Sequence, residues 1–237
     1  MMDARLELPG GESKNFAIFA HCFTCSKDVH AATRISRALT RMGISVLRFD
    51  FTGLGNSDGD FSNTNFTTNV SDLVNAYEYL SEHYQAPEIL IGHSLGGAAV
   101  LAGASSMEYI KVVATIAAPS KVNHIEEIFG SKVSEIEREG EASVKLAGRE
   151  FVIKKQFLDD VRSISLEEKL KRISASLLIF HSPEDQIVSV DHANEIYQAA
   201  EYPKSLISLQ GASHMLDKAE DSELVADIIS SWCKRYL

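Results

Sequence analysis

The feature that most constrains the fold of this chain is a repeated alternation between short apolar runs and longer segments of helical period. The apolar runs are rich in β-branched residues, which predicts buried strands. They occupy residues 16–20, 44–50, 88–92, 111–118, 176–181 and 205–210. The clearest helical patterns span residues 29–42, 67–84 and 218–236. This order predicts an α/β fold with a mostly parallel central sheet, helices on both faces, and an edge strand at ARLEL, residues 4–8.

One long segment, residues 120–172, interrupts the alternation where a short crossover would suffice. It contains a helical pattern from Val122 to Ile136 and an alternating pattern at 142–157, with Gly148 as the turn of a predicted hairpin. We therefore expect a single domain over residues 1–237, with a core of residues 1–119 and 173–237 and an inserted cap at about 120–172. Such a cap would cover the sheet edge where open α/β sheets bind ligands.

The strongest chemical signal is Gly-x-Ser-x-Gly at residues 92–96, which follows a predicted strand and precedes a helix of small residues. In this context the motif predicts a nucleophile elbow, in which Ser94 occupies a strained turn and raises its hydroxyl above the sheet. Side chains in place of Gly92 or Gly96 would collide with neighbouring backbone. A glycine-rich turn with an idle serine is the alternative, but the partners that a nucleophile needs follow in order.

A serine nucleophile requires a base, and the base requires a carboxylate that orients it. His214 follows the last predicted strand and is the candidate base, and the loop after residues 176–181 supplies Asp185 and Glu184 as candidate acids. We prefer Asp185, because its shorter side chain fits a loop held by a proline. The other histidines that end strands are His21, His93 and His181, whereas those within helical patterns, expected at the surface, are His30, His83 and His192.

The loop His21-Cys22-Phe23-Thr24-Cys25 follows the strand at residues 16–20. In this architecture such a loop supplies one backbone amide to an oxyanion hole, and the residue after the nucleophile supplies the other. The donors are then Phe23 and Leu95, and the sulfur atoms of the loop should be dispensable. Further candidate residues of the pocket are His21, Cys22, His93 and His124.

The Cys-x-x-Cys spacing also allows a redox pair, because Cys22 and Cys25 precede a predicted helix. A zinc site would need more ligands nearby, so neither a metal nor a cofactor is expected. The three cysteines form no disulfide framework, which agrees with a reducing compartment.

The net charge of −10 argues against nucleic acid and anionic membranes as partners, since both bind through clustered Lys and Arg. The chain has no signal-peptide pattern and no apolar run of the roughly 18 residues that span a bilayer. We therefore expect a cytoplasmic protein, either a monomer or a homodimer, whose partner is a small-molecule ester.

Five segments together resemble one lineage of α/β-hydrolases, which occurs alone or fused ahead of an OsmC-like domain. They are HCFTCSKD, RFDFTGLGNSDGDF, IGHSLGGAAVL, HSPEDQIV and GASHML. The chain is also similar to the short cinnamoyl and feruloyl esterases, which carry glycine where this chain has Cys22. The resemblance implies Ser94, Asp185 and His214 as catalytic residues, with Phe23 and Leu95 as oxyanion donors. The chain ends after its last predicted helix, so we expect no OsmC-like domain.

These observations predict an esterase that acts through an acyl-enzyme intermediate on aromatic or short acyl esters. A thioesterase or peptidase could use the same residues. Two hypotheses from other classes stay open, namely a non-catalytic binding module and a Cys-x-x-Cys redox protein.

Overall fold

The computed structural model describes residues 1–146, 148–201 and 203–237. Its main sheet contains seven strands in the order β1-β3-β2-β4-β5-β8-β9. Among the described strands of this sheet only β1 runs antiparallel, paired with β3, and it lies at one edge, as predicted for ARLEL. The strands are β1 (Ala4–Glu7), β2 (Asn15–Ala20), β3 (Ile44–Phe49), β4 (Ile89–His93), β5 (Val112–Ile116), β8 (Ser176–His181) and β9 (Lys204–Ser208).

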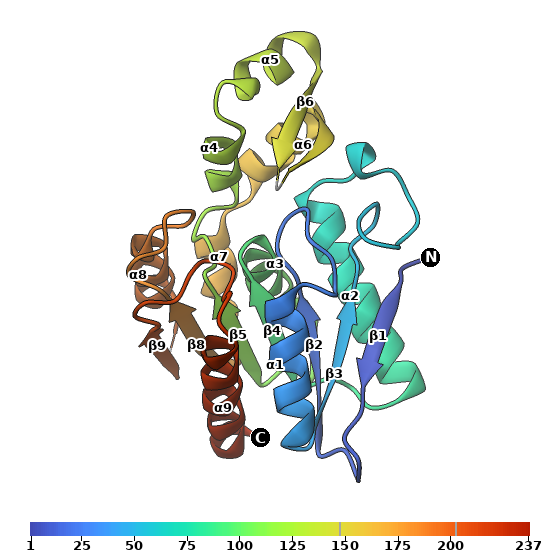
Figure 1. Cartoon of the computed structure of the whole chain (residues 1–237), viewed down its shortest axis with the longest axis vertical. Coiled ribbons are helices and arrows are strands. Elements are labelled where there is room, and N and C mark those ends of the chain that lie inside the picture. Colours follow the sequence, from blue (N-terminus) through green and yellow to red (C-terminus); the bar gives the residue numbers. More distant parts are fainter. Residues whose placement is uncertain (147, 202) are drawn as a thin grey trace.

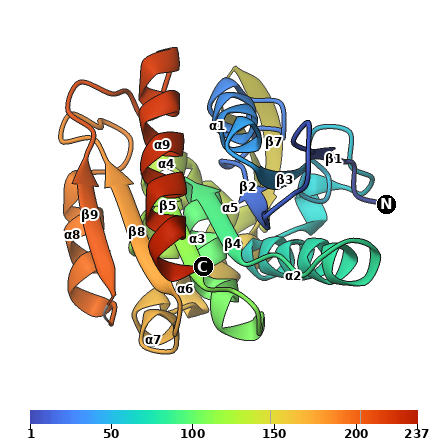
Figure 2. The same ribbon diagram turned by 90° about the horizontal axis from the view of Figure 1, so that it is seen from below.

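Helices cover both faces of this sheet (Figure 2). On one face α1 (His30–Arg41) packs beside α9 (Ala219–Tyr236). The other face carries α2 (Phe66–His83), α3 (Leu95–Gly103) and α8 (Val190–Ala199). The predicted fold class is therefore confirmed. Among the described residues, no helix combines the length and the apolar character that a membrane span needs.

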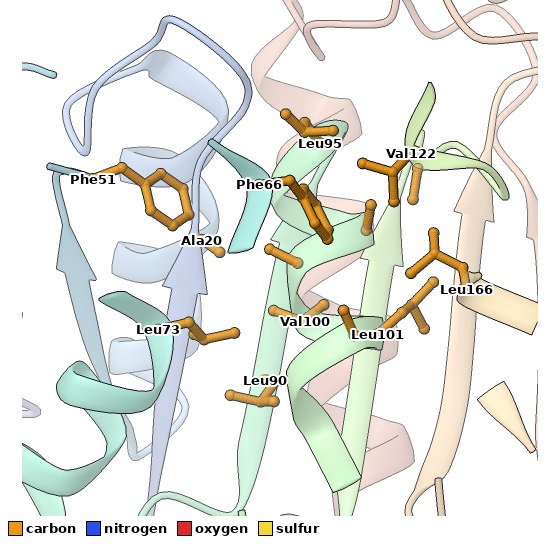
Figure 3. Close-up of a cluster of buried hydrophobic side chains, with 14 of the residues drawn as sticks. Ala20, Phe51, Phe66, Leu73, Leu90, Leu95, Val100, Leu101, Val122 and Leu166 are labelled. Carbon is orange, nitrogen blue, oxygen red and sulfur yellow. The ribbon is translucent and has the colours of Figure 1, made fainter. Parts of the chain in front are cut away.

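The period of the strands explains why the sheet has two cores. Along β2, Ala17 and Phe19 face the core under α1 and α9, whereas Phe16, Ile18 and Ala20 belong to the core on the opposite face. Helix α3 is buried along its whole length and consists mainly of glycine and alanine, so it can lie close to the sheet. Figure 3 shows Val100 and Leu101 of α3 near Leu90 of β4 and Leu73 of α2.

The insertion between β5 and β8 stands above the carboxyl ends of the parallel strands (Figure 1). The predicted hairpin is confirmed, and it is followed directly by a helix. The helical pattern from Val122 to Ile136 is not one helix, because Gly130, at φ +56°, separates α4 from α5. The elements are α4 (Ile125–Phe129), α5 (Lys132–Glu139), β6 (Glu141–Leu146), β7 (Arg149–Lys154), α6 (Lys155–Ser163) and α7 (Leu166–Leu170).

Both ends of the insertion are rooted in the main core. Val122 at its start and Leu166 of α7 belong to the same buried cluster as Phe66 and Leu95 (Figure 3). Removing all of residues 120–172 would therefore open the core as well as uncover the site.

Helix α6 also docks against the amino-terminal end of α2. Asp160 accepts hydrogen bonds from the amide of Thr67, at 2.9 Å, and from its hydroxyl, at 2.6 Å. Gln156, one turn earlier, bonds to the side chain of Asn65 and to the carbonyl of Thr64, both at 2.7 Å. A carboxylate at a helix amino terminus satisfies free amides and opposes the positive end of the helix dipole.

Candidate active site

Ser94 lies in a sharp turn between β4 and α3. Its backbone has φ +55° and ψ −123°, a conformation that few residues other than glycine adopt. The Ser94 amide donates to the carbonyl of Ile116 on the neighbouring strand β5, at 2.8 Å, which holds the turn to the sheet. A strained residue that the surrounding structure holds in place is typical of functional sites.

The glycines around Ser94 allow this turn to pack. A Cβ atom on Gly92 would collide with the backbone of Gly96, and one on Gly96 would collide with the carbonyl oxygens of Ala20 and His21. The amino-terminal end of α3 therefore touches the end of β2 through bare backbone. The steric requirement that the motif predicted is present on both sides of Ser94.

The structure brings Ser94, His214 and Asp185 into one hydrogen-bonded chain. The Nε2 atom of His214 lies 3.1 Å from the Ser94 hydroxyl oxygen, and its Nδ1 atom lies 2.7 Å from an Asp185 carboxylate oxygen. An ionised carboxylate can only accept, so Nδ1 carries the imidazole proton and Nε2 is free to accept from the serine. The three side chains come from loops after β4, β8 and β9.

Asp185 is held in its ionised form. Burial alone would favour the neutral acid, but the hydrogen bond from His214 and the amides of Val188 and Ile187 outweigh it and lower the pKa of Asp185. These amides donate to the second carboxylate oxygen at 3.0 and 2.8 Å. Glu184, the other candidate acid, is exposed and instead accepts from the Gly211 amide, at 3.0 Å.

His93 contacts the loop that carries His214. It is fully buried, and its Nε2 atom donates to the backbone carbonyl of His214 at 2.7 Å. Burial lowers the pKa of His93 to about 4, so it is neutral at physiological pH. His93 was a candidate pocket residue, but it contacts the loop of His214 instead. This contact could not be predicted from the sequence, because it depends on how the end of β4 meets the loop of His214 in the folded chain.

Phe23 belongs to the loop after β2, and Leu95 directly follows Ser94 at the start of α3. Both line a small pocket of about 10 Å³, together with His21, Phe51, Leu54, Asn69 and Gly96. Within the described chain, neither backbone amide donates to a protein acceptor, so both are available to an anion. Leu95 is also the first residue of α3, where the helix dipole favours negative charge.

The ring of Phe23 is held by aromatic residues of the core and the insertion. Its centroid lies 5.5 Å from that of Phe157 on α6, 5.6 Å from that of Phe61 and 6.1 Å from that of Phe129 on α4. Rings at these separations contribute roughly 0.5–1.5 kcal/mol per pair beyond their burial. The insertion thus contacts directly the residue that carries one of the two free amides.

Cys22 and Cys25 form a disulfide, with their Cα atoms 5.5 Å apart. The sequence predicted no disulfide framework and left a redox pair open, and the structure contains this one local disulfide. The turn between them, closed by a hydrogen bond from the Cys25 amide to the Cys22 carbonyl at 3.2 Å, brings the two side chains together without any wider framework. Cys22 is buried at the base of the loop, while Cys25 is half-buried.

His124 lies away from Ser94, near the loop that carries Asp185. Its Nε2 atom is 3.0 Å from the carbonyl of Ile187, and its ring packs edge-on against His192 with centroids 4.6 Å apart. His192, expected at the surface, is half-buried and lies 2.7 Å from the Ser120 hydroxyl, which also donates to Glu195. These contacts link the start of the insertion to α8.

A large cavity lies elsewhere, between α6, α7 and α8. It measures about 770 Å³ and does not include Ser94. The hydrogen-bond geometry, and not the cavity volume, therefore locates the candidate site. Over the part of the chain that the structure describes, no group of three or more His, Cys, Asp or Glu side chains is placed to hold a metal ion.

Comparison with known proteins agrees with this fold. The model of the alpha/beta hydrolase family matches residues 17–228, and the chain belongs to this family. Among solved structures, the chain is similar to an esterase domain of a Rhodothermus marinus protein, with 45% identity over 98% of this chain and 92% of that one and a TM-score of 0.79. It is also similar in fold to Est1E of Butyrivibrio proteoclasticus, solved with ferulic acid, with 21% identity, a TM-score of 0.86 and coverage of 99% and 95%.

Curated relatives are more distant. The palmitoyl-protein thioesterase ABHD10 of Mus musculus is 25% identical over 206 residues, which cover 83% of this chain and 68% of that protein. The uncharacterized protein YfhR of Escherichia coli O157:H7 is 25% identical over 180 residues, and the match spans only 55% of its length. The resemblance to the lineage associated with OsmC-like domains stays a prediction.

Proposed function

We propose that this protein is a serine hydrolase that cleaves carboxylic esters through an acyl-enzyme intermediate. The observation that carries the proposal is the chain of hydrogen bonds from Ser94 through His214 to Asp185. Ser94 is the nucleophile, His214 the general base and Asp185 the carboxylate that orients the imidazole and stabilises its protonated form. The esterase domain at 45% identity supports the same reaction.

In the first step the Ser94 hydroxyl oxygen attacks the acyl carbonyl while its proton passes to Nε2 of His214. The carbonyl oxygen becomes an oxyanion that the amides of Phe23 and Leu95 stabilise. His214 then returns the proton to the alcohol oxygen as the C–O bond breaks, which leaves the acyl group on Ser94. Water, activated by His214 in the same way, releases the acid and restores the serine.

The insertion serves as the cap of this site, and the small space beside the two proposed oxyanion donors favours a short acyl group. The pocket beside Phe23 and Leu95 is only about 10 Å³, close to the minimum that holds one water molecule. Its walls include rigid elements such as the first turn of α3. We therefore expect acetate and propionate esters to react faster than octanoate esters of the same alcohol.

A thioesterase is the second candidate, because ABHD10 is similar along 83% of this chain. The same residues would attack a thioester carbonyl, and the thiol would leave in place of the alcohol. A panel of short and long acyl esters and acyl thioesters with matched acyl groups separates the two. Preference for long-chain thioesters would replace the proposed activity.

The decisive test compares the unmodified protein with Ser94→Ala on p-nitrophenyl acetate. We expect kcat to fall by at least about a thousandfold, as for other catalytic serines, and labelling by a fluorophosphonate probe to disappear. Activity that survives in Ser94→Ala would refute the serine mechanism. A folded protein without esterase activity or labelling would favour a binding module.

Ser120→Ala is the matched control. Among the described residues, Ser120 is the other serine that hydrogen-bonds to a histidine, with His192 at 2.7 Å, but Glu195 accepts from the serine and not from the histidine. Ser120 therefore lacks the order of groups that activates a nucleophile. The Ser120→Ala variant should keep its kcat within about twofold and keep its fluorophosphonate labelling.

A further inference from the structure

The disulfide closes the turn that holds the proposed oxyanion donor, which gives the loop sulfur atoms a role that the sequence did not predict. Only Phe23 and Thr24 lie between Cys22 and Cys25. Thr24 has φ +59°, a left-handed conformation that a threonine rarely adopts without support. The direction in which the Phe23 amide points depends on this short covalent ring.

Both ends of the loop are anchored independently of the disulfide. At its start, Nδ1 of His21 donates to the carbonyl of Cys22 at 2.8 Å. At its end, Asp50 accepts from the Lys27 amide at 2.5 Å and from the Lys27 ammonium at 2.9 Å, with the Asp50 side chain completely buried. Breaking the disulfide would therefore loosen only the backbone of residues 23–25 and leave the rest of the fold in place.

The disulfide is reachable from solvent on one side. Cys25 lines an open cavity of about 420 Å³, together with Ser26, Asp28, Asn56 and Arg149, whereas Cys22 is only 4% exposed. A reagent that enters this cavity reaches Cys25, whereas Cys22 does not line it. The guanidinium of Arg149 on β7 also donates to the carbonyl of Thr24, so the same cavity joins the turn to the insertion.

We propose that the Cys22–Cys25 disulfide is a reversible site for dithiol reductants and that its reduction lowers the turnover of the hydrolase. The inference rests on the proposed function, because it acts through the Phe23 amide. If the protein is cytoplasmic, as its sequence predicts, such a disulfide belongs to the class that is transient or senses redox conditions. Reduction would then lower the activity of the folded protein, and oxidation would restore it.

The chemistry is thiol–disulfide exchange. One thiolate of the dithiol attacks Sγ of Cys25, the Cys22–Cys25 bond breaks, and Cys22 leaves as a thiolate that takes up a proton. The second thiolate of the reductant then attacks the reductant's own sulfur in the mixed disulfide with Cys25. The bond to Cys25 breaks, and Cys25 leaves as a thiolate that takes up a proton. Two electrons reach the protein, two protons are bound by its thiols, and the reductant becomes a disulfide.

Reduction should change kcat more than KM. The oxyanion forms only during the reaction, so a displaced Phe23 amide weakens the transition state and leaves ground-state binding largely intact. Loss of one such donor in other enzymes lowers kcat by about 100- to 1000-fold. The ring of Phe23 remains packed against Phe61, Phe129 and Phe157, so we expect a partial effect of about tenfold.

The experiment measures kcat and KM on p-nitrophenyl acetate for the oxidised protein, for the protein reduced by dithiothreitol, and after reoxidation. Mass spectrometry of alkylated, denatured samples counts the free thiols in each state. Cys22→Ser/Cys25→Ser imitates the reduced loop. Cys233→Ser is the matched control, because Cys233 is buried in α9 and burial raises its pKa to about 12, which keeps it unreactive.

We expect reduction of the folded protein to free both loop thiols and lower kcat about tenfold, with recovery on reoxidation. The double variant should match the reduced protein and ignore dithiothreitol, while Cys233→Ser should respond like the unmodified chain. A change in kcat below about threefold with both thiols free, or a disulfide that resists dithiothreitol until the protein unfolds, would overturn the inference. Loss of Ser94-dependent activity in every state would refute the proposed function itself.

Discussion

Two fully buried, neutral histidines should make the protein sensitive to mild acid. Burial lowers the pKa of His21 and of His93 from 6.5 to about 4. Above pH 6.5 these histidines are neutral in both the folded and the unfolded chain. Between pH 6.5 and about pH 4, both histidines are mostly protonated in the unfolded chain and mostly neutral in the folded protein. The free energy of unfolding therefore falls as the pH is lowered through this range.

The size of the effect follows from these values. At about pH 5 each histidine lowers the free energy of unfolding by about 2 kcal/mol relative to pH 8, and the two together by about 4 kcal/mol. A domain is typically stable by roughly 5–15 kcal/mol, so this is a large share of the total. The pKa of His181 and that of His192 are also lowered by burial, which adds to the same trend.

Urea unfolding followed by circular dichroism at about pH 8 and pH 5 measures this difference. His93→Gln keeps a donor for the His214 carbonyl and removes the titrating ring, so the loss of stability between the two pH values should shrink by about 2 kcal/mol. His30→Gln, at an exposed position, is the control and should leave the difference unchanged. Equal stability at the two pH values, or an unchanged difference in His93→Gln, would refute the reasoning.

Three further predictions concern the site and its support. Asp185→Asn should lower kcat by at least about a thousandfold, whereas Glu184→Gln should change it less than about fivefold, measured by ester hydrolysis; the reverse ranking would move the acid to Glu184. Gly96→Ala forces a methyl group against backbone carbonyls, so thermal unfolding should show a loss of about 3 kcal/mol or more, and a stable variant would contradict the tight contact. Asp50→Asn removes one of the carboxylates around the buried Lys27 ammonium, which keeps Asp3 at 2.6 Å, and should destabilise the protein by about 1–3 kcal/mol, while the exposed Asp58→Asn should cost less than about 1 kcal/mol in the same urea titration.

The sheet could be predicted because its strands are short, apolar and bounded by turn residues. Residues 16–20 and 176–181 are buried strands whose hydrophobicity is visible without a structure. The helical pattern from Val122 to Ile136 was misleading, because its apolar spacing continues through Gly130 although the backbone turns there. Periodicity shows which side chains share a face and does not show where a glycine ends a helix.

The sequence motif and the order of residues along the chain were enough to predict the three residues of the candidate site. Ser94, Asp185 and His214 follow strands in the expected order, and the structure places their side chains within hydrogen-bonding distance. The disulfide could not be predicted, because the pairing of Cys22 with Cys25 depends on the conformation of the turn between them. The contact of Asp50 with Lys27 was not predicted either. The signal that pointed to Asp50 was a charged residue at the end of an apolar strand and before a glycine-rich turn.

The docking of α6 on α2 limits how the insertion can be exchanged among relatives. Gln156 and Asp160 anchor the insertion on the first turn of α2, and a transplanted segment without them would leave the Thr67 amide and the Thr64 carbonyl without these partners. Libraries that seek new substrates should therefore keep this pair constant. Variation belongs on α4 and on the exposed side of the hairpin, where Ile128 and Val152 already face solvent and where changes leave the anchor intact.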